Sequence, residues 1–396
     1  MNKEQNLETI NVGIVGHIDH GKTTLLHKLS GKWADSHSEE LKRGITIRLG
    51  YADVIIKEDK GIYGREKGNP VRHVSFIDSP GHEMLMATML SGAALIDVAI
   101  LVIAANEGIK PQTREHLIAL QAKGVKNLIV VQNKIDLVTK EQALKNYEEI
   151  KKFLKEDYKN APIIPISAQQ DVNIDVIYKS LVEIKIPERE KDSPPLFLVA
   201  RSFDINRPGT EPKNLRGAVL GGALKKGTLK IGDEIEIKPG RVIKESNKFY
   251  YKTLNTKVLS LFNGSQKVNE LTPGGSMSIE TELDMTLGKS DELAGCIVSK
   301  KGSLPETSEN IKIEFQLFPE IFDNAGSLPV EKVKPSEILL LSVNTSMSLG
   351  IVKRIKENII EFSLKVPIVP LKGNNVSIAR NFNNHWRLIG YGEIID

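Results

Sequence analysis

The residues best suited to chemistry form a short run of glycine, histidine, aspartate, lysine and threonine near the amino terminus. Residues 16–23 read Gly-His-Ile-Asp-His-Gly-Lys-Thr, between the apolar residues 12–15 and a helix-like segment at 24–29. In such a strand–loop–helix arrangement the glycines let successive backbone N–H groups face a phosphate chain, and the helix adds the positive end of its dipole. The run therefore predicts a phosphate-binding loop, in which Lys22 contacts the outer phosphates and the Thr23 hydroxyl binds magnesium. The residues that we expect along the phosphates are Asp19, His20, Gly21, Lys22, Thr23 and Thr24.

Two histidines, His17 and His20, lie inside this loop. We assign no chemistry to their side chains, which we expect to be structural or solvent-exposed. The alternative interpretation of the whole segment is a glycine-rich turn without a ligand. The strand before it and the helix after it favour the phosphate-binding loop.

A second loop, Asp-Ser-Pro-Gly-His at residues 78–82, follows an apolar-leaning strand at 73–77. A carboxylate at a strand end can reach magnesium through a coordinated water, which is the role expected of Asp78. Glycine tolerates the geometry that lets the Gly81 amide approach the γ-phosphate. His82 is predicted to orient the attacking water, as glutamine does in small GTPases. The alternative for His82 is a surface histidine beside a mobile loop.

A third loop, Asn-Lys-Ile-Asp at residues 133–136, follows the predicted strand at 128–132. An ionised carboxylate accepts two hydrogen bonds, and the guanine edge offers two neighbouring donors, N1–H and the exocyclic amine. Adenine offers an acceptor at N1, so the carboxylate of Asp136 would repel it. Asp136 therefore predicts selection of guanine over adenine.

Further residues are expected around the base. Asn133 would brace the base and the loop, and the aliphatic stem of Lys134 would cover the face of the base. A backbone N–H for guanine O6 would come from the segment Ser167, Ala168 and Gln169.

The remaining loop, Arg-Gly-Ile-Thr-Ile at residues 43–47, lies between the phosphate loop and Asp78. Thr46 is placed to give magnesium a second hydroxyl while a γ-phosphate is present and to release it after hydrolysis. Taken singly, Thr46 could be an ordinary strand residue and Asn-Lys-Ile-Asp an ordinary polar turn. Five such motifs in this order predict GTP binding.

Composition narrows the class of protein. A chain of 396 residues is too long for one compact core, which favours roughly two to four domains. The single cysteine, Cys296, excludes an internal disulfide and a cysteine-cluster metal site. No signal-peptide core and no run of about twenty apolar residues is present, so we expect a cytoplasmic protein without a membrane partner. The net charge of +4 permits an RNA partner without requiring one.

Up to about residue 187 short apolar strands alternate with amphipathic helices. Continuous apolar runs at 98–104 and 128–132 are typical of parallel strands that are buried on both faces. Helices are expected at 112–123, 140–158 and 173–184, and a further strand at 163–167. This series predicts an α/β P-loop GTPase domain, with a mostly parallel sheet and helices on both faces.

The pattern changes after a charged, proline-rich linker at 187–195. Short alternating strands with glycine turns follow, for example at 229–238, and no long helix is convincing. The spacing predicts two β-barrels that part near 302–310. The predicted domains are the GTP-binding domain at 1–190, β-barrel domain II at 191–305 and β-barrel domain III at 306–396.

The motifs together resemble a translational GTPase. Longer segments are similar to the γ subunit of archaeal and eukaryotic initiation factor 2, and the resemblance extends from about Asn11 to the carboxyl terminus, weakest after about Val330. The segments that carry it are residues 43–53, 200–210, 217–224 and 232–237.

The resemblance implies the core of a heterotrimer with an α and a β subunit. Such a protein carries methionylated initiator tRNA to the small ribosomal subunit with GTP, and hydrolyses GTP at start-codon selection. In the family, positions that match Asp19 and the backbone of Gly44 are linked with a second metal ion, while Thr23 and Thr46 would hold the main magnesium.

One segment departs from the family. Its members often carry a four-cysteine zinc knuckle between the first switch loop and the Asp-x-Pro-Gly motif, whereas residues 57–72 here contain no cysteine. His73 alone cannot form a structural zinc site, which needs four nitrogen or sulfur ligands. We therefore predict no zinc, and a plain glycine-rich loop at 60–70.

Two rival interpretations remain. An elongation-factor-Tu-like or selenocysteine-specific elongation factor has the same domain order, although an end at Asp396 leaves no room for the extra domains of the latter. A protein that uses GTP only as a structural ligand is disfavoured by Thr46 and His82.

The sequence does not identify the residues that contact tRNA. The second domain has a basic stretch, for which solvated lysines are favoured over an RNA surface: Lys225, Lys226, Arg241, Lys244 and Lys248.

Overall fold

The computed structural model describes residues 7–32, 50–78, 86–154, 158–246, 248–323, 326–383 and 385–396. Contacts between residues divide the chain into two compact units. The first unit comprises Met1–Pro187, Pro319–Val330 and Asn384–Leu388. The second comprises Glu188–Phe318, Glu331–Asn383 and Ile389–Asp396.

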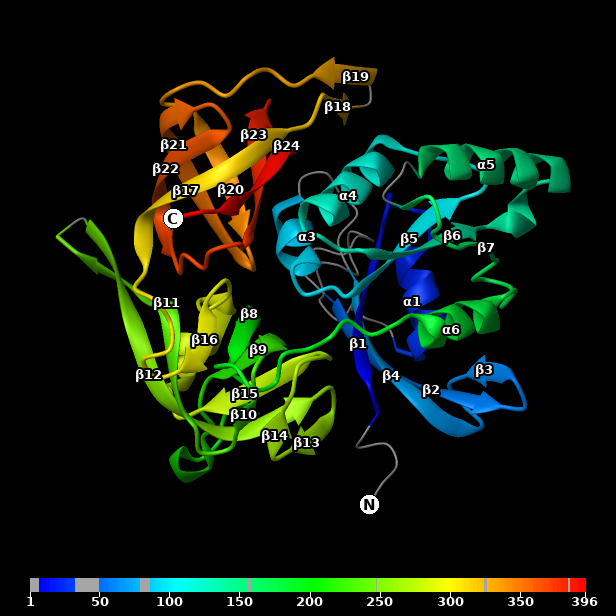
Figure 1. Cartoon of the computed structure of the whole chain (residues 1–396). Coiled ribbons are helices and arrows are strands. Elements are labelled where there is room, and N and C mark those ends of the chain that lie inside the picture. The colour runs from blue at the N-terminus through cyan, green and yellow to red at the C-terminus, as the bar shows by residue number, and fades with distance from the viewer. Residues whose placement is uncertain are drawn as a thin grey trace. The chain divides into compact units, whose positions relative to one another are not determined.

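The first unit is built on a seven-stranded sheet of order β3-β2-β4-β1-β5-β6-β7 (Figure 1). Five strands run parallel: β1 (Thr9–Gly16), β4 (Asn69–Asp78), β5 (Val98–Ala104), β6 (Asn127–Asn133) and β7 (Ile163–Pro165). At one edge β2 (Gly50–Asp59) and β3 (Ile62–Gly64) are antiparallel. The mixed edge fits the prediction of a mostly parallel sheet.

Helices cover both faces of this sheet. Figure 1 shows α1 (Lys22–Ser30) and α6 (Ile174–Glu183) on one face, and α3 (Met86–Ala93), α4 (Pro111–Ala122) and α5 (Lys140–Phe153) on the other. All seven residues of β5 are buried, because helices shield it from both sides. Leu25 and Leu29 of α1 pack with Leu181 of α6 in the core under the sheet. The predicted α/β GTPase fold is confirmed.

Three predicted boundaries in this unit were wrong. The strand expected at 73–77 begins at Asn69, four residues earlier. The helix expected to reach Tyr158 ends at Phe153, where Leu154 leaves helical geometry with ψ of 53°. Its start is fixed by a capping box, in which the Thr139 hydroxyl accepts from the Gln142 N–H at 3.3 Å. The strand expected at 163–167 ends at Pro165.

The predicted glycine-rich loop at 60–70 was also partly wrong, because it contains strand β3. Gly61 adopts a φ of 85°, and its N–H donates to the Glu58 carboxylate at 2.6 Å. That tight turn folds β3 back on β2, so that Lys57 pairs with Gly64. The cysteine-free segment is therefore a β-hairpin at the edge of the sheet.

The second unit contains two closed barrels, as predicted. In the first, β11 and β12 pair and close a ring that runs β11-β16-β8-β9-β15-β12, with β13 beside β12. Its strands are β8 (Leu196–Phe203), β9 (Val219–Lys226), β11 (Glu234–Glu245), β12 (Lys248–Asn263), β13 (Gln266–Val268), β15 (Met277–Thr281) and β16 (Ile297–Lys300). Two short strands, β10 (Leu229–Lys230) and β14 (Glu270–Leu271), pair separately.

The second barrel closes in the order β17-β22-β21-β20-β23-β24. Its strands are β17 (Ser308–Leu317), β20 (Ile338–Val343), β21 (Ser346–Lys356), β22 (Ile359–Ile368), β23 (Asn375–Phe382) and β24 (His385–Ile394). Buried and half-buried residues alternate along β22, because one face of each strand lines the core. A small hairpin of β18 (Glu320–Asp323) and β19 (Gly326–Pro329) lies between β17 and β20 in the sequence.

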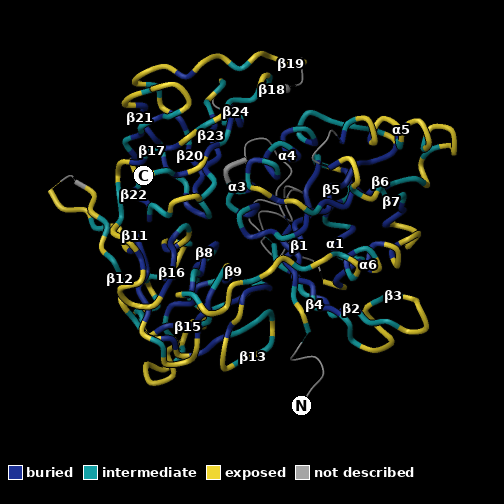
Figure 2. Tube along the Cα trace, in the orientation of Figure 1, coloured by how far each residue is buried: buried dark blue, intermediate teal, exposed yellow. Residues whose placement is uncertain are grey.

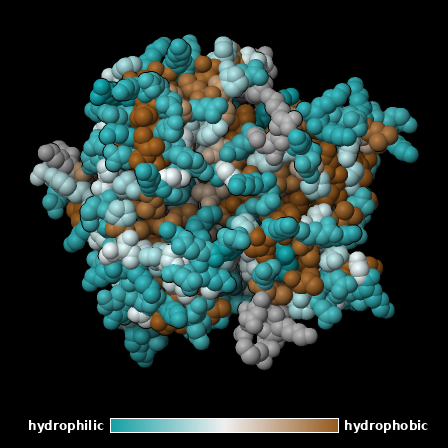
Figure 3. Space-filling model, viewed as in Figure 1, coloured by the Kyte–Doolittle hydropathy of each residue, from teal (hydrophilic) through white to brown (hydrophobic). Residues whose placement is uncertain are grey.

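The surface is mainly polar. Hydrophilic residues cover most of the face that Figure 3 shows, with smaller hydrophobic areas between them. In the parts of the chain that the structure describes, no helix has the length and apolar character needed to cross a bilayer.

Candidate nucleotide site

The phosphate loop joins the end of β1 to the start of α1, as the sequence predicts. Both of its glycines are required by their surroundings. A Cβ on Gly16, whose φ is 138°, would lie 2.4 Å from the Val102 carbonyl oxygen. A Cβ on Gly21, whose φ is 90°, would lie 2.4 Å from Asn133 Nδ2. The loop therefore passes too close to β5 and to the Asn133 side chain for any other residue.

Lys22 is the first residue of α1, and its side chain is buried inside this loop. Its Nζ donates a hydrogen bond to the His17 carbonyl at 2.8 Å. Burial lowers the pKa of Lys22, and the carboxylates of Asp78 and Asp19 oppose that effect. A buried ammonium group is costly unless anions compensate it, so this loop is suited to an anionic ligand such as a phosphate chain.

Thr23 and Asp78 come from different elements and meet beside Lys22. The Thr23 hydroxyl donates to Asp78 Oδ2 at 3.3 Å, and Asp78 is fully buried at the end of β4. Hydroxyl and carboxylate oxygens are the hard donors that magnesium prefers. The residues therefore fit a magnesium ion. Asp19 is exposed in the same loop, in the left-handed region with φ of 62°.

Asn133 connects three of the predicted loops. Its Nδ2 donates to the His20 carbonyl at 2.9 Å, and its Oδ1 accepts from the Ala168 N–H at 3.1 Å. Because Asn133 is buried, both hydrogen bonds are shielded from water. The side chain thereby ties the phosphate loop to the segment that follows β7, where Ser167 is buried and Gln169 exposed.

The other residues that are predicted to recognise the base lie just after β6. Asp136 is exposed in a one-turn 3-10 helix at Ile135–Leu137. Lys134 has a left-handed backbone with φ of 62°, a strained conformation for a lysine. Its Nζ lies 3.6 Å from the Glu107 carboxylate, which also lies 3.7 Å from Lys110 Nζ. Sequence reasoning missed Glu107, since nothing in its motif marks it as a partner of Lys134.

His116 is a second residue that sequence reasoning missed. It lies on α4, and its Nδ1 accepts the Gly16 N–H at 2.9 Å. The ring must be unprotonated at Nδ1 for this bond, and burial lowers the pKa of His116 to about 3. His116 therefore fixes the backbone at the first glycine of the phosphate loop.

The histidines of the loop itself differ in exposure. His20 is fully buried, and burial lowers its pKa to about 3. Its Nδ1 lies 3.3 Å from the Val102 carbonyl oxygen. His17 is half-buried, and burial again lowers its pKa. These surroundings are those of structural side chains that are neutral at pH 7.

The buried His116 predicts a pH dependence of stability. Between its usual pKa of 6.5 and its folded pKa of about 3, the unfolded chain binds a proton there that the folded chain does not. The free energy of unfolding should therefore fall as pH decreases, by up to about 2 kcal/mol for this residue between pH 6.5 and pH 5. Urea unfolding of the wild type and of His116→Gln at several pH values measures the free energy of unfolding. Plotted against pH, this free energy should change less steeply for the variant. Equal slopes would contradict the assignment.

Four predicted site residues lie outside the described residues: Gly44, Thr46, Gly81 and His82. Their positions relative to Thr23 and Asp78 stay predictions.

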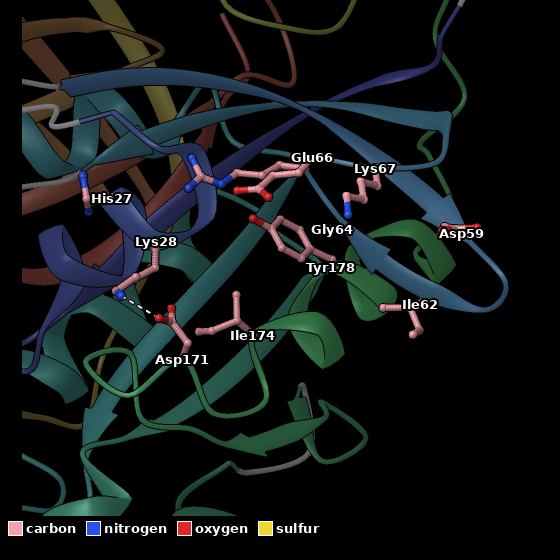
Figure 4. Close-up of a pocket in the computed structure, with 11 residues that line it drawn as sticks. His27, Lys28, Asp59, Ile62, Gly64, Glu66, Lys67, Asp171, Ile174 and Tyr178 are labelled. Carbon is pink, nitrogen blue, oxygen red and sulfur yellow. Dashed lines mark hydrogen bonds and ion pairs between the residues drawn. The ribbon is translucent and has the colours of Figure 1, made fainter.

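A separate cavity of about 640 Å³ lies where α1, the β3 hairpin and α6 meet (Figure 4). Lys28 forms an ion pair with Asp171 at 2.8 Å, and the Tyr178 hydroxyl donates to the Leu29 carbonyl at 2.7 Å. Its cationic and anionic side chains balance in number: Lys28, Arg65, Lys67, Asp59, Glu66 and Asp171. With no net charge to select a ligand, we assign this cavity no role.

Comparison with known proteins identifies the family of the chain. Residues 7–187 match the family described as Elongation factor Tu GTP binding domain, and residues 309–394 match Initiation factor eIF2 gamma, C terminal. Translation initiation factor 2 subunit gamma of Methanococcus vannielii is 49% identical over 98% of this chain and 99% of that protein. The protein of the same name from Pyrococcus furiosus is 49% identical over 97% of both chains.

Solved structures share the fold. A bacterial selenocysteine-specific elongation factor, EF-Sec, is 25% identical with a TM-score of 0.78, and this chain covers 58% of its length with 98% of its own. Elongation factor SelB from Methanococcus maripaludis, in complex with the GTP analogue GppNHp, is 24% identical with a TM-score of 0.74 over 99% of this chain and 80% of that one. At this level of identity SelB supports the fold alone.

The fold, the phosphate loop and these matches define a translational GTPase of the elongation factor Tu type. Within that class, the chain belongs to the family of translation initiation factor 2 gamma subunits. It is a GTP-dependent initiation factor, and the resemblance stated from the sequence is confirmed.

Proposed function

We propose that the chain carries methionylated initiator tRNA to the small ribosomal subunit in its GTP form. It releases the tRNA when GTP is hydrolysed at start-codon selection. It acts in the cytoplasm as the core of a heterotrimer with an α and a β subunit. The observation that carries this proposal is the 49% identity with proteins named subunit gamma over nearly the full length of both chains.

The phosphates and metal ions have distinct residues in this proposal. Lys22, with the loop amides from Asp19 to Thr24, binds the β- and γ-phosphates, because its ammonium group is buried in that loop. Thr23 and Thr46 would hold magnesium directly, and Asp78 would hold it through water. A bound magnesium ion would neutralise charge on the outer phosphates. Asp19 and the Gly44 backbone would bind a second metal ion.

Guanine recognition rests on the loops that Asn133 joins. Asp136 accepts the two guanine donors, and the stem of Lys134 covers the base. The residues after β7, namely Ser167, Ala168 and Gln169, contribute a backbone N–H to guanine O6. Because Asn133 already accepts from the Ala168 N–H, it holds this segment close to the phosphate loop.

In hydrolysis, His82 orients a water molecule toward the γ-phosphorus. The water oxygen forms a new bond to that phosphorus while the bond to the β–γ bridging oxygen breaks. The bridging oxygen stays on GDP, and the protons of the water go to the phosphate product and to the solvent. The Gly81 amide and Thr46 contact the γ-phosphate before this step and lose the contact afterwards. The loss of these contacts acts on the three predicted domains, at 1–190, 191–305 and 306–396.

The proposal predicts magnesium without zinc. The edge hairpin formed by β2, β3 and the start of β4 offers no thiolate, so it cannot form a cysteine site. Elemental analysis of the purified chain with GTP should find magnesium and no stoichiometric zinc. One zinc per chain would contradict the interpretation of this hairpin.

The test of the function is the affinity for initiator tRNA in two nucleotide states. The full chain with a non-hydrolysable GTP analogue should bind methionylated initiator tRNA about 5- to 150-fold more tightly than with GDP, the usual range of coupling between two sites. Elongator aminoacyl-tRNA serves as the control and should bind more weakly. Equal affinities in the two nucleotide states would defeat the switch, and a preference for elongator tRNA would defeat the initiator assignment.

A further inference from the structure

The strands β11 and β12 extend beyond the wall of the first barrel as a two-stranded ribbon. Residues 235–240 of β11 are buried, and those from Arg241 onward are mostly exposed. The pairing shifts register between Ile237 and Arg241, then continues from Arg241 opposite Lys252 to Glu245 opposite Lys248. Figure 2 shows this end of the ribbon coloured mainly as exposed. We call residues 241–252 the basic hairpin.

Apolar and aromatic side chains are exposed on both faces of the basic hairpin. Phe249 is 60% exposed, Tyr250 50% and Val242 46%. Successive residues of a strand face opposite sides, so Phe249 and Tyr250 lie on opposite faces of the ribbon. Exposing two neighbouring aromatic rings in this way is costly in water, which points to a partner with flat apolar faces.

The charges of the hairpin are unbalanced. The sequence of residues 241–252 has four basic residues and one acidic residue. Arg241 lies directly opposite Lys252, and like charges in that position destabilise a strand pair. Among the residues that the structure describes, neither of these two nor Lys244 forms an ion pair with a carboxylate. The charge of Arg241 acts on the nearby Asp284 carboxylate, whereas Lys244 and Lys252 retain charges that an anionic partner would neutralise.

In the basic hairpin a cationic side chain lies close to an aromatic ring. Phe249 is paired with Lys244, whose Nζ lies 5.9 Å from the centre of the ring. Unpaired RNA repeats the same alternation, since each base with a π face is followed by a phosphate. A base can stack on an exposed ring while its phosphate pairs with the neighbouring cation. Rings on both faces suit a strand whose bases are splayed around the ribbon, whereas a duplex keeps its bases stacked.

We propose that the basic hairpin binds unpaired RNA, with bases stacked on Phe249 and Tyr250 and phosphates paired with Arg241, Lys244 and Lys252. This contact goes beyond the proposed function, because it requires neither the nucleotide site nor the switch between GTP and GDP. It gives the factor an RNA surface that remains available in either nucleotide state.

The experiment measures the affinity of the full chain for a fluorescein-labelled 12-nucleotide oligouridylate, by anisotropy over a range of salt concentrations. The double variant Phe249→Ser with Tyr250→Ser should bind at least about 25-fold more weakly, because it removes two stacking contacts that contribute at least about fivefold each. The double variant Arg241→Gln with Lys252→Gln should lower the slope of log affinity against log salt by about 1.4, or 0.7 per phosphate contact.

The double variant Arg241→Gln with Lys252→Gln is expected to fold normally. Removing the opposed Arg241 and Lys252 relieves a repulsion, so the hairpin should keep or gain stability. The matched control is Ile351→Ser with Lys353→Gln on β21, where both residues are exposed on the other barrel, and it should bind RNA like the wild type. GTP affinity should be the same in all variants.

Three results would overturn the proposal. Unchanged RNA affinity in both hairpin variants would remove the contact. If the chain bound polyglutamate of the same charge with equal affinity, the hairpin would attract anions in general and would not recognise RNA. Hairpin variants that keep their RNA affinity but no longer hold another subunit of the factor in a pull-down would assign the hairpin to an acidic protein instead.

Discussion

Replacing Asp136 with asparagine should weaken GTP binding by at least about 10²-fold and shift the preference toward xanthosine triphosphate. The carboxylate accepts from guanine N1–H and the exocyclic amine, and asparagine presents its amide NH₂ to one of these donors. Asparagine Oδ1 can still accept from N1–H, but the other hydrogen bond is lost and two donors are left facing each other, which costs several kcal/mol in a desolvated site. Xanthine carries an oxygen where guanine carries the amine, so it restores the match with asparagine. Direct titration with both nucleotides measures the effect.

The control for this prediction is Asp175→Asn, an exposed aspartate on α6. It changes the net charge of the protein equally and should leave both affinities unchanged. If Asp136→Asn bound GTP like the wild type, Asp136 would not read the base. A similar loss in Asp175→Asn would instead indicate a general effect of charge.

The sequence predicts best those contacts that the topology of a parallel sheet enforces. Gly16, Asp78 and Asn133 each end a strand, and these strands run in the same direction in one sheet. Their ends must therefore meet at one edge, whatever the details of the helices. The sequence therefore predicts that Thr23 shares a site with Asp78, and the structure confirms it. It predicts that Asn133 braces the base and its own loop, and the bonds from Asn133 to the two neighbouring loops come from the structure alone.

Contacts that depend on the packing of helices and loops were not predictable. His116 accepts from Gly16 only because α4 places its buried face against β1, and a helical pattern does not show which strand a given residue will contact. The partnership of Glu107 with Lys134 is similar, since it joins the loops that follow two adjacent strands. Helix α5 ends at Phe153, where Leu154 is buried and leaves helical geometry, although Lys and Glu residues favour helix beyond that point.

The β3 hairpin shows a different limit. Glycines at 61, 64 and 68 argue for a loop by composition. The structure nevertheless pairs residues 62–64 with β2, because a strand at the sheet edge needs only backbone hydrogen bonds and one tight turn at Gly61. Sequence patterns detect strands by their buried side chains, and in this strand only Tyr63 packs, partly buried, against the core.

Replacing His82 with alanine should slow GTP hydrolysis by about 10²-fold or more while GTP and initiator tRNA affinities stay within about twofold of the wild type. A group that acts on the attacking water contributes typically 10²- to 10⁴-fold to the rate, and it makes no contact with the base or the tRNA. The loss should therefore appear in the rate of single-turnover hydrolysis with ribosomal subunits and not in binding.

The His82→Gln variant sharpens this test, because glutamine orients the water in small GTPases and should recover part of the rate. Partial recovery by glutamine, with none by alanine, is expected only if the side chain positions water through hydrogen bonds. A purely structural role would instead lower GTP and tRNA binding together with hydrolysis, since the loop at residues 78–82 would lose its shape. If His82→Ala hydrolysed GTP as fast as the wild type, His82 would be a surface residue without a catalytic role, and another group would orient the water.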